Sequence, residues 1–205
     1  MNAAEIRDAL ELIGVAAVVR TSDPTEALVT SRSLIRAGIG VIEVTFTVPD
    51  APEVIRELSS EGHAMIGAGT VTTPEQFDAA IAAGARFVVA PVHPSFLIAA
   101  AREANVLAVP GCATPNEIWV AILAGALAVK VFPISRLGGP SYLRDLAGPL
   151  PDLHLMPSGG IGIEDVGAYR SAGAWCVAVG GPLSGHMSEA DRQRRAQRAA
   201  ELART

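Results

Sequence analysis

Short apolar runs recur along the chain at intervals of about 20–25 residues, and each is followed by turn residues and a segment of helical periodicity. The runs are apolar throughout instead of alternating with polar residues, which is typical of strands in a parallel sheet covered by helices. Eight strands are predicted, over residues 15–20, 41–45, 65–69, 87–91, 106–110, 128–132, 153–157 and 175–180. Helices are predicted over residues 24–37, 50–60, 74–83, 94–104, 115–124, 139–147, 164–171 and 189–203, and a short N-terminal helix precedes the first strand.

The predicted helices carry start and stop signals. Asp23-Pro24, Thr73-Pro74 and Thr114-Pro115 each place a side-chain oxygen at the N-cap and a proline at the first helical position, where a missing N–H does no harm. Several helices end in Ala-Gly, where glycine can adopt the left-handed conformation that ends a helix. These pairs are Ala37-Gly38, Ala83-Gly84, Ala124-Gly125 and Ala172-Gly173.

Eight even strand–helix units predict an α/β protein with a (β/α)8 TIM barrel that forms one domain over residues 1–205. An open, doubly wound sheet is the alternative. The chain has no GxGxxG motif after its first strand, and this favours the closed barrel. No linker or shift in composition indicates a second domain.

The composition allows a large core and argues against several classes of function. Half of the residues are hydrophobic, 18% are charged and 4% are aromatic, which suits close helix-on-sheet packing and neither base stacking nor disorder. The formal net charge of -5 gives no general attraction for nucleic acid or a membrane surface. One basic run is interpreted as a solvated helix face because acidic residues are interspersed; it contains Arg192, Arg194, Arg195 and Arg198.

Metal and disulfide sites are not expected. Cys112 and Cys176 lie far apart outside any CxxC motif, so both are predicted to be reduced core residues. The four histidines show no ligand spacing with each other or with acids, so neither a metal nor another cofactor is predicted. The chain lacks a signal-peptide pattern and an apolar run of roughly 18 residues, which predicts a soluble, cytoplasmic protein without a membrane partner.

Lys130 is the strongest candidate for a catalytic residue. In a barrel of this kind the active site lies at the C-terminal ends of the strands, and Lys130 is a cation within an otherwise apolar strand. Side chains alternate along a strand, so Lys130 shares a face with Phe132, and Val129 with Val131. If the valines face the helices, the lysine points into the barrel, where a neutral amine can attack a ketone. The alternative is a lysine that points outward and extends between helices. Lys130 is the only lysine of the chain, and arginine supplies every other cationic side chain, which is difficult to explain if this lysine only decorates the surface.

Glu43 and Arg20 are further candidates at the same rim. Glu43 lies in the second predicted strand between Ile42 and Val44, so it shares the inner face with Thr45 and can pair with Lys130 and relay protons. A purely structural salt bridge is the alternative for Glu43. Arg20 ends the first strand, where its guanidinium can hold a carboxylate through two hydrogen bonds. The alternative is that Arg20 is an ordinary surface arginine.

Two glycine pairs close the last two strands. Gly159 and Gly160 follow Ser158 after the seventh strand, and Gly180 and Gly181 follow the eighth. Loops at these two strand ends commonly bind phosphate through backbone N–H groups, and glycine allows the close approach. Plain turn chemistry is the alternative for each pair taken alone.

In these motifs the chain resembles the 2-keto-3-deoxy-6-phosphogluconate aldolases, a family that includes 4-hydroxy-2-oxoglutarate aldolases and 6-phosphogalactonate-specific relatives. The resemblance covers nearly the whole chain. It rests on the ordered motifs Glu43-Val44-Thr45, Gly67-Ala68-Gly69-Thr70-Val71, Pro110-Gly111-Cys112-Ala113-Thr114, Lys130-Val131-Phe132-Pro133 and Pro157-Ser158-Gly159-Gly160-Ile161.

The resemblance implies a class I aldolase that needs no cofactor and releases pyruvate and glyceraldehyde 3-phosphate, usually as a homotrimer. It implies that Lys130 forms the Schiff base and that Glu43 is the general acid/base. Thr70 and Pro91 match positions near the pyruvyl group, Phe132 packs beside the lysine, and Ser158 stands where a threonine is often found. The phosphate-binding backbone is matched by Gly159, Gly160, Gly180 and Gly181.

Two departures from the family pattern bear on the substrate. Thr47 stands where the gluconate-type enzymes carry an arginine; the galactonate-type relatives lack it too and have an arginine where Arg20 stands. Arg20 is therefore expected to hold the carboxylate. Pro182 stands where a serine or aspartate is common, so one contact to phosphate is expected to be missing, and a non-phosphorylated substrate stays open.

Other functions remain open from the sequence. A 4-hydroxy-2-oxoglutarate aldolase would use the same lysine and release glyoxylate. A phosphosugar isomerase or epimerase would use Glu43 as a base and Lys130 only for its charge. A non-catalytic barrel that binds a sugar phosphate would use the same polar rim for affinity alone.

Overall fold

The computed structural model describes residues 1–204 and contains the predicted alternation of strands and helices. The strands are β1 (Val15–Val19), β2 (Val41–Thr45), β3 (Met65–Gly69), β4 (Phe87–Val89), β5 (Leu107–Val109), β6 (Gly111–Cys112), β7 (Val129–Val131), β8 (Leu155–Pro157) and β9 (Val177–Val179). The helices are α1 (Ala3–Ile13), α2 (Pro24–Arg36), α3 (Ala51–Glu61), α4 (Pro74–Ala82), α5 (Leu97–Ala104), α6 (Pro115–Leu123), the 3₁₀ helix η1 (Ile134–Arg136), α7 (Pro140–Ala147), α8 (Val166–Ser171), α9 (Gly181–Ser184) and α10 (Glu189–Leu202).

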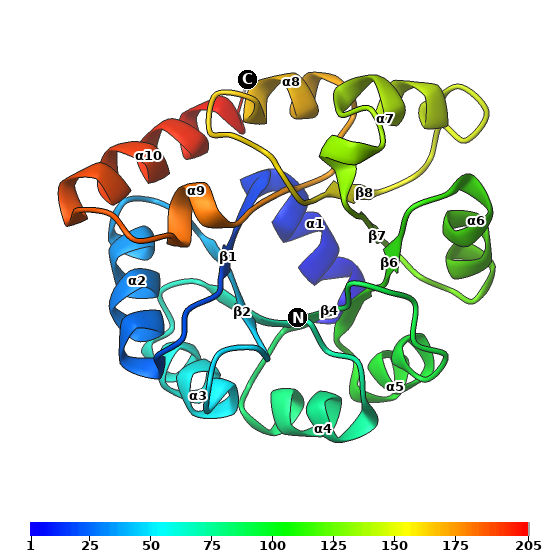
Figure 1. The fold of residues 1–205 in the computed structure, drawn as a ribbon. Helices are drawn as coiled ribbons and strands as arrows, with labels where there is room; N and C mark the ends of the chain where they lie inside the picture. Colours follow the sequence, from blue (N-terminus) through cyan, green and yellow to red (C-terminus); the bar gives the residue numbers. More distant parts are fainter. Residues whose placement is uncertain (205) are drawn as a thin grey trace.

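All strand pairs are parallel, and they form two sheets that curl around a common centre (Figure 1). The larger sheet has the order β5-β4-β3-β2-β1-β9 and the smaller one β6-β7-β8. The helices lie outside the strands, while α1 lies across the centre of the view. This arrangement brings the C-terminal ends of the strands to one rim, as the repeated strand–helix pattern predicts.

The sheet differs from the prediction of one closed eight-stranded barrel. The predicted strand 106–110 is divided into β5 and β6 because Pro110, between them, has no N–H to donate to a ladder. Pro157 likewise lacks a donor at the end of β8. An isolated bridge between Ser158 and Ala178 and a hydrogen bond from the Trp175 N–H to the Leu155 carbonyl link this side to the larger sheet without a continuous ladder. The prediction of a parallel sheet covered by helices is confirmed, and its closure into one eight-stranded barrel stays a prediction.

Helix boundaries largely follow the signals in the sequence. The Asp23, Thr73 and Thr114 side chains each accept a hydrogen bond from the backbone three residues on, as N-caps do. Gly38 and Gly84, two of the predicted helix-ending glycines, have φ angles of 98° and 94°. The short elements η1 and α9 were not predicted, because runs of three or four residues carry too little periodicity to be detected.

The two faces of the strands pack into separate apolar clusters. Val129, Val131 and their counterparts on the other strands contact the surrounding helices in the main core. The inward side chains form a second cluster at the centre, which includes Phe87 and Leu107. Two fully buried residues of α1, Ile6 and Leu10, complete this inner cluster. The N-terminal helix therefore fills the end of the interior that lies opposite the rim.

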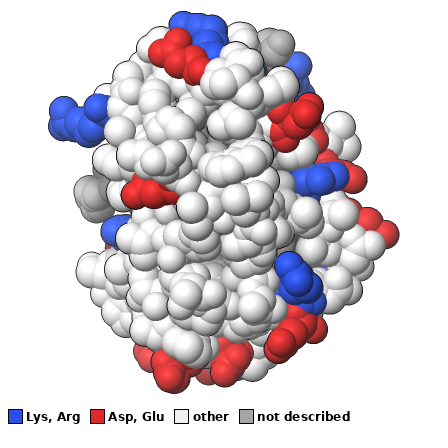
Figure 2. Space-filling model, turned by 90° about the vertical axis from the view of Figure 1, so that its right-hand side faces the viewer, with Lys and Arg blue, Asp and Glu red and all other residues white. Residues whose placement is uncertain are grey.

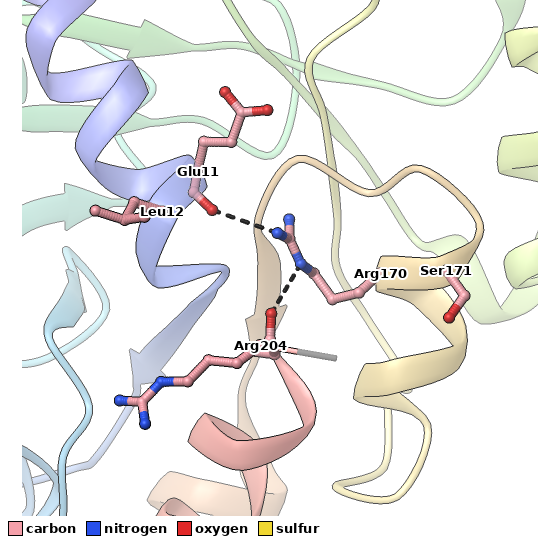
Figure 3. Close-up of a pocket in the computed structure, with 6 residues that line it drawn as sticks. Glu11, Leu12, Arg170, Ser171 and Arg204 are labelled. Carbon is pink, nitrogen blue, oxygen red and sulfur yellow. Dashed lines mark hydrogen bonds between the residues drawn. The ribbon is translucent and has the colours of Figure 1, made fainter.

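Arg170 ties several backbone segments together at this lower end. Its Nη1 donates to the Ala174 carbonyl at 2.6 Å, and its Nε donates to the Ala203 carbonyl at 3.1 Å. Figure 3 shows the guanidinium between the end of α1, where it reaches the Glu11 carbonyl, and the end of α10. The residues here line a hollow of about 490 Å³. Because carbonyl groups occupy the guanidinium, Arg170 stabilises this end of the fold.

Candidate active site

Lys130 and Glu43 meet inside the curled sheets, as the alternation along their strands predicts. The Lys130 Nζ lies 3.7 Å from the Glu43 Oε1, and the two side chains are 8% and 0% exposed. Among residues 1–204, no side chain or backbone group donates a hydrogen bond to either Glu43 oxygen. The carboxylate is thus held close to the lysine without being committed to another protein donor, which suits it to proton transfer with a bound molecule.

Gly69 explains how a carboxylate fits at this depth. It pairs with Thr45 across the β2–β3 ladder, beside Glu43. A Cβ atom at Gly69 would lie only 2.1 Å from the Glu43 Oε1. Gly67 makes similar room for the Phe87 ring, which its Cβ would approach to 2.4 Å. The Gly67-Ala68-Gly69 segment is therefore required by side chains that point inward from the neighbouring strands.

Arg20 and Thr70 are brought together at the rim, although they are 50 residues apart in the chain. The Arg20 Nη2 donates to the Thr70 Oγ1 at 3.2 Å. Thr70 has a φ of 59°, a left-handed conformation that costs a non-glycine residue roughly 1–2 kcal/mol. Arg20 is exposed and forms no ion pair with a carboxylate of the described chain, so its guanidinium is available to an anionic ligand.

Two threonines, Thr45 at the end of β2 and Thr47 just after it, contact each other near this rim. The Thr45 Oγ1 donates to the Val19 carbonyl at 3.1 Å and lies 2.8 Å from the Thr47 Oγ1. Thr45 is fully buried and Thr47 is exposed. The hydroxyls thus lead from the buried Glu43 strand towards the rim that carries Arg20.

Three residues that were predicted to lie near Lys130 differ in their contacts and exposure; they are Phe132, Ser158 and Pro91. The Lys130 Nζ lies 5.6 Å from the centre of the Phe132 ring, within cation–π range, and the ring is 37% exposed at the rim. Ser158 is 6% exposed, and its N–H donates to the Val131 carbonyl at 3.0 Å. Pro91 ends the β4 segment, where Gly111 lets its backbone approach closely.

The two glycine pairs differ in their surroundings. Gly159 and Gly160 have φ angles of 94° and 76° and pack against the segment after β7. A Cβ at Gly160 would come 2.2 Å from the Ser135 Oγ, so η1 lies directly on this loop. Gly180 and Gly181 have no heavy atom of the described chain within 4 Å of an added Cβ, so they border open space.

Neither a metal site nor a reactive thiol accompanies these residues. The described residues contain no group of three side chains arranged to hold a metal ion. Burial raises the pKa of both Cys112 and Cys176 to about 12, with the Glu117 carboxylate adding to the effect at Cys112. Both thiols therefore stay protonated and unreactive at neutral pH.

None of the helices in residues 1–204 has the length and apolar character needed to cross a membrane.

Comparisons with known proteins identify the family of the chain. The model of the family "KDPG and KHG aldolase" matches residues 6–197. The chain belongs to this family. It is 35% identical to the 2-dehydro-3-deoxy-phosphogluconate aldolase of Treponema pallidum over 192 residues, which cover 90% of this chain and 91% of that protein.

Two further relatives carry information about the site. The chain is 35% identical over 170 residues to the 2-dehydro-3-deoxy-6-phosphogalactonate aldolase of Escherichia coli, with 82% of each protein covered. It is 29% identical to the KDPG aldolase of Legionella pneumophila, which was solved with pyruvate captured as a covalent carbinolamine. That structure superposes with a TM-score of 0.80 over 97% of this chain and 96% of its own.

Sequence reasoning missed the residues that act by leaving room or by supporting loops. Gly69 was recognised as part of a motif, but its contact with Glu43 depends on the register between β2 and β3. Ser135 was not considered, because its position against Gly160 follows from the unpredicted helix η1. Two glycines on the strand next to a buried acid, one at its register partner Gly67 and one two residues further at Gly69, are a signal that could have identified this space.

We predict that Gly69→Ala lowers the kcat of aldol cleavage about 100-fold, because the new methyl group displaces the Glu43 carboxylate by the order of an ångström. Gly148→Ala is the matched control, since its added Cβ meets nothing closer than 3.8 Å. Steady-state kinetics on both variants, with circular dichroism to verify folding, measure the effect. A folded Gly69→Ala variant with wild-type kcat would contradict this role.

Proposed function

We propose that this chain is a Schiff-base aldolase that cleaves 2-keto-3-deoxy-6-phosphogluconate or its galactonate epimer to pyruvate and glyceraldehyde 3-phosphate. The observation that carries the proposal is the buried pair of Lys130 and Glu43 at 3.7 Å. An amine and a carboxylate held together in an apolar interior are the two groups that iminium chemistry on a keto acid requires.

In the first half of the reaction, the Glu43 carboxylate takes a proton from the Lys130 ammonium 3.7 Å away, and the resulting neutral amine attacks the C2 ketone of the substrate. Glu43 donates a proton to the departing hydroxyl of the carbinolamine, so that water leaves and an iminium forms. The Glu43 carboxylate is then free to accept a proton, since no protein donor within residues 1–204 occupies its oxygens.

In the second half, the iminium withdraws electrons from the C3–C4 bond. Glu43, directly or through a water molecule, removes the proton of the C4 hydroxyl, and C4 leaves as an aldehyde. The remaining enamine is protonated at C3, and water hydrolyses the iminium to release pyruvate and restore Lys130. The aldehyde-lyase reaction needs no cofactor, because the lysine itself supplies the electron sink.

The substrate's carboxylate is assigned to Arg20. Its exposed guanidinium lies at the rim next to Thr70 and lacks a carboxylate partner in the described chain. Thr47 cannot replace it, since a hydroxyl carries no charge. An arginine at the end of the first strand and none at position 47 is the arrangement of the galactonate-type enzymes, so the galactonate epimer is a substrate to test beside the gluconate one. 4-Hydroxy-2-oxoglutarate is the smaller alternative substrate.

The remaining site residues surround the two ends of the substrate. Thr70, Pro91 and Phe132 border the pyruvyl end near Lys130, and Ser158 contacts the hydroxyl-bearing chain. The distal phosphate is assigned to the backbone of two glycine pairs, which can approach an anion closely. These are Gly159, Gly160, Gly180 and Gly181.

We also propose that the two sheets form one closed (β/α)8 barrel. Backbone hydrogen bonds from Lys130 to the Pro110 carbonyl and from Trp175 to the Leu155 carbonyl, both at 2.8 Å, support continuity on either side of the smaller sheet. Closure would give Glu43 and Lys130 a common interior although they lie in different sheets.

Reductive trapping tests the aldolase proposal. The protein is incubated with pyruvate, reduced with borohydride, digested and analysed by mass spectrometry. We expect an N-(1-carboxyethyl) adduct, the reduced Schiff base of pyruvate, on the peptide that holds Lys130 and none in Lys130→Met. Because Lys130 is the only lysine, the α-amino group of Met1 is the other primary amine that peptide mapping must distinguish.

The same experiment separates the alternatives. An isomerase or epimerase that uses Lys130 only for its charge, or a non-catalytic binding protein, would give a folded protein without an adduct at saturating pyruvate. That outcome would overturn the proposal. Assays of pyruvate release with the gluconate, galactonate and 4-hydroxy-2-oxoglutarate substrates then rank the substrates.

We further propose that the protein assembles as a homotrimer through the face that carries α6. Figure 2 shows that this face is largely without charged residues across its centre. Four large apolar side chains of α6 and the following turn are exposed there, from 38% to 69%. These are Trp119, Val120, Leu123 and Leu127. A contiguous apolar surface of this kind is typical of an interface between subunits.

We predict that Leu123→Glu dissociates the assembly, because a buried charge without a partner opposes association. The wild type should sediment with three times the chain mass of 21.1 kDa, and the variant with the mass of one chain. Val29→Glu is the matched control, since Val29 is 52% exposed on α2. A monomeric wild type, or a Leu123→Glu variant that stays trimeric, would count against this interface.

A further inference from the structure

A hollow of about 620 Å³ lies where the loop after β8 meets α9 and α10. It is lined by four residues of the loop, two of them acidic, by Pro182 from α9 and by three arginines from α10; the loop residues are Gly162, Ile163, Glu164 and Asp165. The loop is the continuation of the Gly159-Gly160 pair, and Pro182 directly follows Gly180-Gly181. The hollow therefore adjoins both segments to which the substrate's phosphate is assigned.

The three arginines differ in how they are neutralised. Arg194 pairs with Asp191, and Arg198 pairs with Glu164 at 2.8 Å. Arg195 lies within 4 Å of no carboxylate oxygen in residues 1–204. Its only side-chain hydrogen bond among these residues runs from Nη1 to the Pro182 carbonyl, at 3.3 Å. Arg195 is exposed, so most of its N–H donors are available to a ligand.

Pro182 provides no hydrogen-bond donor to an anion bound at this point of the chain. A proline has no backbone N–H, and its ring has no hydroxyl or other donor. The position that follows the second glycine pair can thus contribute neither a backbone nor a side-chain donor to an anion. A guanidinium can replace both, because its planar set of donors matches the oxygens of a phosphate.

We propose that Arg195 binds the distal phosphate of the aldol substrate and makes the enzyme selective for phosphorylated substrates. This inference rests on the proposed aldolase function. The 3.3 Å hydrogen bond to the Pro182 carbonyl holds the guanidinium next to the residue that follows the second glycine pair, and Gly162, two residues after the first pair, lines the same hollow. The charge that recognises the phosphate then comes from α10, a helix outside the strand ends.

The test compares a phosphorylated aldol with its counterpart that lacks the phosphate. We expect Arg195→Met to raise the KM for the phosphorylated aldol about 10- to 100-fold, as for the loss of a hydrogen bond to a charged group. The KM for the non-phosphorylated aldol should stay within about twofold of wild type, and Arg195→Lys should recover part of the affinity. Inorganic phosphate should inhibit the wild type more strongly than Arg195→Met.

Arg194→Met is the matched control, because Arg194 lines the same hollow but is paired with Asp191. It should leave both KM values unchanged. The proposal is overturned if Arg195→Met changes neither KM, or if it raises both KM values equally, as a purely structural contact with Pro182 would. Borohydride trapping at Lys130 distinguishes a failure of the Arg195 proposal from a failure of the aldolase proposal. An adduct in both wild type and Arg195→Met shows that the aldolase site is intact, whatever the KM values show about phosphate.

Discussion

The buried contact between Lys130 and Glu43 is the interaction on which the rest of the structure depends. Removing an ammonium and a carboxylate from water is expensive, and an apolar interior accepts them only as a pair. Their 3.7 Å separation is set by the strands that carry them, which lie in different sheets. The catalytic proposal therefore requires the relative position of the two sheets to be fixed.

The two ends of the interior are built for different tasks. At the lower end, α1 inserts Ile6 and Leu10 into the central cluster, and Arg170 fastens the helix end by its carbonyl. At the rim, Thr70 is held in a left-handed conformation and Arg20 and Phe132 are exposed. Stability is thus concentrated opposite the substrate, while at the rim the Arg20 guanidinium has a hydroxyl partner in Thr70 and no carboxylate partner among residues 1–204.

The sequence contained the architecture because strand alternation is a local property. The prediction that Val129 and Val131 face the helices, and that Lys130 faces inward, needs only the period of two residues along a strand. The Lys130–Glu43 pair followed from the same rule applied to two strands. The division at Pro110 was foreseeable from its missing donor, but the predicted strand 106–110 ran through it.

Other features depend on contacts between distant segments, which local patterns do not contain. The space that Gly69 leaves for Glu43 depends on the β2–β3 register. Arg195 was grouped with its neighbours as a solvated helix face, which holds for the acid-paired Arg194 and Arg198. It is wrong for Arg192, which is 6% exposed because it lies on the packed side of α10. Only the packing of α10 against α9 distinguishes Arg195 from them.

The central claim is that Lys130 holds the keto acid covalently while Glu43 moves its protons. Deuterium exchange into the methyl group of pyruvate in D₂O, followed by NMR, tests both parts without the second substrate. The account predicts exchange in the wild type and none in Lys130→Met. In Glu43→Gln, the exchange rate divided by the fraction of enzyme that carries the pyruvate adduct should fall about 10²- to 10⁴-fold. Exchange at the wild-type rate in Glu43→Gln, or any enzyme-dependent exchange in Lys130→Met, would contradict it.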